Sequence, residues 1–74
     1  MDDLYNVLWK DPEGNQHVDK KYVDIDEMEN AVRRLTSGPA AIGGIVKEVL
    51  VTGTMDCTLF LWRNGKVLFP TSRE

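Results

Sequence analysis

Residues 45–70, IVKEVLVTGTMDCTLFLWRNGKVLFP, decide the fold of this chain. They predict three consecutive strands, at 45–52, 57–62 and 66–69, because β-branched and aromatic residues fill each run and turn residues separate the runs. Asn64-Gly65 is the strongest local signal, since both central residues of a type I′ hairpin turn need a positive φ. A two-residue loop at this point predicts four cross-strand pairs. They are Arg63–Lys66, Trp62–Val67, Leu61–Leu68 and Phe60–Phe69.

The predicted hairpin is apolar on both faces. Neighbouring side chains of a strand point to opposite faces, so aromatic and β-branched groups gather on one face and leucines on the other. The sequence leaves open which of these faces a helix covers. The first set is Phe60, Trp62, Val67 and Phe69, and the second is Leu59, Leu61 and Leu68.

Two further strands are predicted before the hairpin. Residues 4–10 alternate between apolar and polar, with Tyr5, Val7 and Trp9 on one side. The next residues, Asp-Pro-Glu-Gly at 11–14, predict a type I turn, because such a turn prefers Asp at its first, Pro at its second and Gly at its fourth position. Residues 16–18 predict a short polar strand at a sheet edge, where polarity discourages pairing with other chains. Residues 19–21 are expected to lead out of that strand.

One helix is predicted at 25–35. Asp24 is expected to cap it, with Glu27 at the third helical position as in an acidic capping box. Residues 36–39, Thr-Ser-Gly-Pro, are typical of a helix end. The sequence leaves open whether 37–44 is a loop or a short helix. The apolar residues at helical spacing predict one buried stripe, made of Ile25, Met28, Ala31, Val32 and Leu35.

These elements predict a small α+β domain with the order β-β-α-β-β-β, a mainly antiparallel sheet and one helix on one face. Seventy-four residues predict a single domain over 1–74. A chain of this length buries only about 60% of its unfolded surface, so we expect oligomerisation to enlarge its core. The single cysteine, Cys57, is expected to be buried, and a lone thiol is typical of a reducing compartment.

The N-terminus, MDDLYNVLWK, lacks the basic and apolar regions of a signal peptide. No apolar stretch approaches the roughly 20 residues that cross a bilayer. We therefore expect a cytoplasmic protein with no membrane association. The short acidic chain, its single cysteine and its dense apolar content are in the style of accessory proteins of phages or plasmids.

The charges are unevenly distributed along the chain. Residues 1–30 hold nine acidic and three basic side chains, whereas 31–74 hold six basic and three acidic ones. One interpretation is that the two halves pack together and attract each other weakly. The other is an acidic face that imitates nucleic acid or docks on a basic partner.

No pattern predicts catalysis, a metal site or a cofactor. A Cys57–His17 nucleophile pair would need the second and fourth strands to meet, and Cys57 is expected to act as a small hydrophobic residue instead. Asp19, Asp24 and Asp26 lack the central glycine of a calcium loop. We therefore expect a protein that is not an enzyme.

The segment 37–44 gives an alternative, a small-molecule site. Its glycines have the spacing of a phosphate loop, but the lysine that should follow is missing. A pocket at a subunit interface could still hold a small anion or a nucleotide on backbone amides and basic side chains. The candidate residues are Arg33, Arg34, Ser37, Gly38, Gly43 and Gly44.

A second alternative is weak binding of single-stranded nucleic acid. Phe60 and Trp62 alternate on a strand, with Arg63 and Lys66 at the adjacent turn, and exposed rings beside basic groups can stack on bases. Against this, the net charge is −3 and sheet aromatics usually pack inside.

An apolar sheet face that the helix leaves uncovered usually marks an interface. The sequence therefore predicts a non-enzymatic interaction or inhibitor-type protein that forms a homodimer or higher oligomer through its sheet and binds an unidentified protein partner. The predicted interface residues are Leu59, Leu61 and Leu68, or Phe60 and Trp62.

Overall fold

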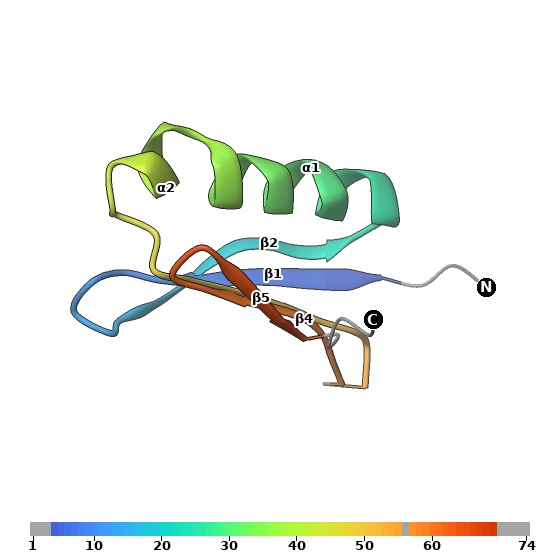
Figure 1. The fold of residues 1–74 in the computed structure, drawn as a ribbon. Coiled ribbons are helices and arrows are strands. Elements are labelled where there is room, and N and C mark those ends of the chain that lie inside the picture. Colours follow the sequence, from blue (N-terminus) through green and yellow to red (C-terminus); the bar gives the residue numbers. More distant parts are fainter. Residues whose placement is uncertain (1–3, 56, 70–74) are drawn as a thin grey trace, which may run out of the picture.

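The structure is a computed structural model that describes residues 4–55 and 57–69. Its five strands form one antiparallel sheet in the order β2-β1-β3-β4-β5, and both helices lie on one face of it (Figure 1). The predicted α+β class and order of elements are confirmed. The elements are β1 (Tyr5–Lys10), β2 (Gln16–Val23), α1 (Ile25–Ser37), α2 (Pro39–Ile42), β3 (Glu48–Thr52), β4 (Thr58–Arg63) and β5 (Lys66–Phe69).

The turn between β1 and β2 forms as predicted. The amide of Gly14 donates to the carbonyl of Asp11 at 3.0 Å, and the Asp11 carboxylate accepts from the amides of Glu13 and Asn15 at 2.9 Å each. β2 lies at a sheet edge, also as predicted. It is longer than expected, because residues 19–23 stay paired with β1 instead of leading away from it.

Asp24 caps α1 as predicted, since its carboxylate accepts from the amide of Glu27 at 2.9 Å. The helix continues past the expected end to Ser37, and α2 is the short helix that the sequence had left open. Ile25 was wrongly placed in the buried stripe, because its side chain is 49% exposed. α1 starts one residue after edge strand β2, so its first side chain lies at the margin of the sheet.

The turn between β4 and β5 also forms as predicted. Asn64 and Gly65 have φ values of 51° and 86°, as a type I′ turn requires. The pairs nearest the turn are correct, including Trp62 with Val67.

A β-bulge follows, and the next two predicted pairs were wrong. Leu61 lies opposite Phe69, not Leu68, and Phe60 has no partner in β5. An extra residue in one strand shifts every side chain beyond it to the other face. Phe69 therefore shares a face with Leu61 instead of with Phe60.

A second irregularity lies in the pairing of β3 with β4, where the sequence predicted regular alternation. The register shifts next to Thr52, which pairs with Thr58, so Leu59 is left as the extra residue of β4. As a result Leu59 lines a groove together with Phe60 instead of sharing the face of Leu61.

β3 begins at Glu48 and not at 45, because the amide of Ile45 donates to the carbonyl of Ala40 at 2.8 Å and holds the chain against α2. Cys57 was expected to be buried, and this was wrong. It precedes β4, and its thiol is exposed.

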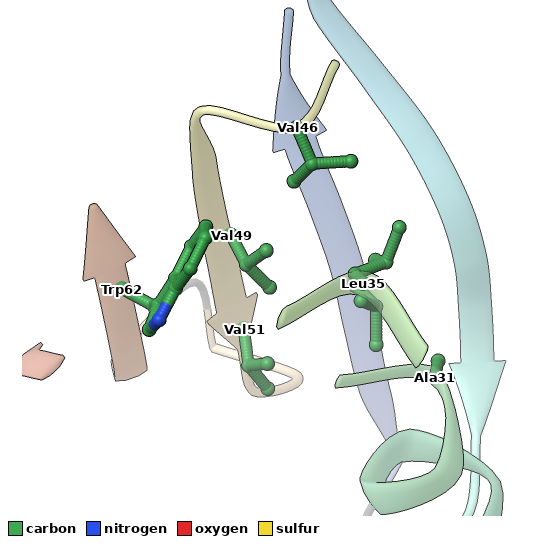
Figure 2. Packing of buried hydrophobic residues seen from close by; sticks show 7 residues of the cluster. Ala31, Leu35, Val46, Val49, Val51 and Trp62 are labelled. Atoms are coloured by element: carbon green, nitrogen blue, oxygen red, sulfur yellow. The ribbon is translucent and has the colours of Figure 1, made fainter. Parts of the chain in front are cut away.

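The core lies between the sheet and the helices. Val7, Val49 and Val51 are fully buried on the sheet, and Ala31 and Leu35 of α1 pack against them. Figure 2 shows Trp62 of β4 beside Val49 of β3 at the margin of this cluster. The helices therefore lie on the face of Phe60 and Trp62, which answers the question that the sequence left open. No helix in the described part of the chain is long and apolar enough to cross a membrane.

Candidate interaction surfaces

The face of the sheet away from the helices carries one apolar side chain from each of the five strands. Side chains of directly opposed residues point to the same face, so the register places these five in a single line across the sheet. We call this line the apolar row. From β2 to β5 it consists of Val18, Leu8, Leu50, Leu61 and Phe69.

The apolar row is accessible along its whole length. Val18 and Phe69, at its two ends, are 58% and 44% exposed. The three leucines between them are half-buried, although neither α1 nor α2 lies over this face. Among residues 4–55 and 57–69, their partial burial thus comes from neighbours within the sheet, and their outer surfaces remain accessible.

A row of charged residues borders the apolar row on one side. Glu48 is its centre, with its carboxylate 3.7 Å from Nζ of Lys10 and accepting from Nε of Arg63 at 2.8 Å. Lys66 continues the row on β5, opposite Arg63. The described charges of this border therefore sum to a net positive value.

A polar row borders the other side. Asn6, Thr52 and Thr58 occupy it, and Nδ2 of Asn6 lies 3.3 Å from Oγ1 of Thr52. Lys21 of β2 lines a hollow on this face together with Asn6 and Thr52, so this margin also carries a positive charge at its β2 end. The ion-paired margin around Glu48 and the mainly uncharged margin around Thr52 make the face asymmetric.

The second surface is a groove on the helix side. α1 packs on β1, β2 and β3, so it leaves the neighbouring half of this face open. An open groove of about 590 Å³ results, with an apolar floor and wall and with polar groups of α1 at its rim. We call it the helix-side groove. Its main lining residues are Tyr5, Met28, Val32, Arg33, Val51 and Phe60.

The structure divides the residues of the predicted anion site. Arg33 and Ser37 line the helix-side groove. Arg34 points elsewhere, because its Nη2 donates to the carboxylate of Asp19 at 2.6 Å. Gly38 donates its amide to the carbonyl of Arg34, which closes the end of α1. Gly43 and Gly44 follow α2, so these residues do not form one loop around a phosphate.

The residues of the predicted nucleic-acid site also lie in different environments. Trp62 is only 9% exposed and belongs to the core, and Phe60 is half-buried against that core. Arg63 is paired with Glu48, on the other face of the sheet from these rings. Lys66 is exposed beside it. The arrangement offers no open pair of rings beside free cations.

The other candidate residues lie in different places. Leu61 is part of the apolar row, Leu59 lines the helix-side groove, and Leu68 is 41% exposed at the bulge of β5. β1 and β3 separate the strands that would have had to join His17 and Cys57. Leu8 and Leu50 were not among the predicted interface residues, although each lies next to a core valine in its strand.

Comparison with protein-family models, with curated proteins and with solved structures found no match to this chain. The apolar row and the helix-side groove are therefore the features from which a function has to be inferred.

Proposed function

We propose that this protein works by binding other proteins, and that it forms a homodimer through its apolar row. The observation that carries the proposal is the unbroken line of apolar side chains from all five strands, on a face that α1 and α2 leave bare. Contiguous apolar patches with polar margins mark protein interfaces. Burying the row would also supplement a core that is small for one domain.

The size of the face predicts a moderate affinity. Five strands with a spacing near 4.8 Å and about six residues each span roughly 20 Å by 20 Å. The resulting area of roughly 400 Å² is about half of the roughly 800 Å² per partner in a standard interface. We therefore expect a dimer that dissociates in the micromolar range, and not a permanent one.

The margins favour one orientation of the two copies. A two-fold axis along the apolar row would set the charged margin of each copy over the Asn6–Thr52–Thr58 margin of the other, with Glu48 near Thr52 of the second copy. An axis along the strands would set Arg63 against Lys10 and Glu48 against itself. Like charges in apposition cost binding energy, so the first axis is the favoured one.

We place this dimer in the cytoplasm. Cys57 has an exposed thiol, and exposed thiols persist in reducing compartments. In an oxidising compartment the same residue would link copies at random instead of through the apolar row.

Light scattering coupled to size-exclusion chromatography tests the proposal. The mass should rise from monomer to dimer over the micromolar range, and Phe69→Asp should keep the protein monomeric. Val67→Asp is the matched control, because Val67 is similarly exposed on the same strand but pairs with Trp62 on the other face. A strict monomer at tens of micromolar would rule out the proposal, as would equal effects of the two variants in proteins whose circular dichroism shows a native fold.

A further inference from the structure

The helix side of the sheet has space for one more helix. Five strands at a spacing near 4.8 Å span about 19 Å, and a helix with its side chains is about 10 Å wide. One face of this sheet therefore accommodates two helices side by side. α1 occupies the half formed by β1, β2 and β3. We propose that the helix-side groove binds an amphipathic α-helix of a partner protein.

The groove is elongated along α1, which favours a helix over a compact ligand. Its wall includes Met28, Val32 and Ser37, which are spread over the length of the helix. A second hollow shares Thr36 with it and continues to Trp62 on the floor. The floor therefore offers apolar side chains in succession along β4. An apolar stripe at helical spacing would lie over them, whereas a small molecule would cover only part of this length.

The charges at the rim define the direction of the partner helix. Glu29 lies at the rim near the beginning of α1, Arg33 one turn later, and Lys47 lines the second hollow beyond the end of α1. Within the described chain none of the three has an ion pair, and Nη1 of Arg33 donates a hydrogen bond to Oδ1 of Asn30 at 3.3 Å. An antiparallel helix would bring its N-terminus to Lys47 and its C-terminus to Glu29.

Helices commonly carry acidic residues in their first turn and basic residues in their last, because these charges complement the helix dipole. In the antiparallel direction the acidic turn meets Lys47, and the basic turn meets Glu29. The partner is therefore expected to have large apolar residues on one stripe, acidic residues in its first turn and basic residues in its last.

A second copy of this chain cannot supply the helix that binds in the groove. Its own α1 already buries Ala31 and Leu35 against its own sheet, so that stripe is not available. The groove also lies on the opposite face from the apolar row, and it stays open in the proposed dimer. The two proposals can therefore fail independently.

A synthetic peptide of defined sequence tests the site. It has about 18 residues, or five helical turns, with leucines along one face, glutamates in the first turn and lysines in the last. One control peptide has the same composition in scrambled order, and another keeps the stripe but exchanges the glutamates and lysines. Binding is followed by fluorescence anisotropy and by the indole ¹⁵N–¹H signals of the full chain, which has two tryptophans.

The striped peptide is expected to bind and to shift the Trp62 indole signal, while the Trp9 signal stays in place because that ring stacks on His17 outside the groove. Exchanging the peptide charges should weaken binding about tenfold. Lys47→Gln should also weaken it, whereas Lys21→Gln is the matched control, because both lysines are exposed but Lys21 lies on the other face of the sheet beside Leu8.

Three results would overturn the proposal. The first is no binding of the striped peptide, and the second is equal binding of the scrambled one. The third is that the small amphiphile laurate shifts the Trp62 signal whereas the striped peptide does not. This result would make the groove a small-molecule site. Equal losses in Lys47→Gln and Lys21→Gln would also contradict it.

Discussion

Asp11 and His17 face each other across the β1–β2 hairpin, with Oδ2 of Asp11 2.9 Å from Nε2 of His17. The imidazole stacks on Trp9 with 4.3 Å between ring centroids, so the ring is held in position from one side. The hydrogen bond from His17 is the main cause that lowers the pKa of Asp11 from its ordinary value of 3.8. Desolvation opposes this shift, and the amides of Asn15 and Glu13 add to it.

The lowered pKa of Asp11 predicts a loss of stability in acid. Because the carboxylate is favoured in the folded state, its contribution is present above pH 3.8 and is lost as the pH falls through the lower folded-state pKa. In Asp11→Asn, thermal unfolding followed by circular dichroism should therefore depend less on pH below 3.8. Glu13→Gln removes a charge from the same turn and is the control. An unchanged pH profile in Asp11→Asn would contradict this assignment.

The Asp24 cap of α1 predicts a measurable loss of stability when its carboxylate is removed. Asp24→Ala removes the acceptor for the amide of Glu27 and should lower the free energy of unfolding by about 1 kcal/mol. Asp24→Asn keeps a side-chain oxygen in the same position, so its effect should be much smaller. Urea unfolding of the two variants separates a cap from a simple change in charge, and equal losses would show that charge alone matters.

The buried stripe of α1 predicts a strong contrast between two of its apolar residues. Leu35 is only 4% exposed, so Leu35→Ala should cost about 3 kcal/mol through lost burial and the cavity that remains. Ile25 is 49% exposed, and Ile25→Ala should cost less than about 1 kcal/mol. Both values come from urea unfolding, and similar losses at the two positions would mean that α1 extends its buried face over its first turn.

The features predicted correctly from the sequence depend on neighbouring residues. Asn64-Gly65 specifies its turn through its own backbone preferences, and Asp24 caps the helix through an amide three residues away. Helical spacing also identified Leu35 as buried. It failed at Ile25, because periodicity defines a face of the helix but does not show where the sheet beneath it ends.

The features that were missed depend on the assembled sheet. The alternation rule has no means to place a bulge, and one extra residue moved Phe69 to the face of Leu61 and another moved Leu59 away from it. The apolar row needs β1 to lie between β2 and β3, a pairing between distant segments. Leu8 and Leu50 were therefore visible as apolar residues but not as one surface.

The orientation of the proposed dimer predicts which residues of the two copies meet. A two-fold axis along the apolar row places Val18 over Val18 of the second copy and Phe69 over Phe69. An axis along the strands would instead place Val18 over Phe69. Packed sheets lie about 10 Å apart, too far for a disulfide, so a short bismaleimide is the appropriate cross-linker between introduced cysteines.

In a Cys57→Ser background, Val18→Cys alone and Phe69→Cys alone should each give a cross-linked dimer on denaturing gels. A mixture of the two variants should give little dimer that contains one copy of each, which mass spectrometry can identify. The opposite result, with cross-linking only in the mixture, would show that the axis runs along the strands. That result would also mean that the repulsion between Arg63 and Lys10 of the two copies is weaker than the attraction between the two apolar rows. The reason would be that Glu48, which pairs with both residues, neutralises part of their charge.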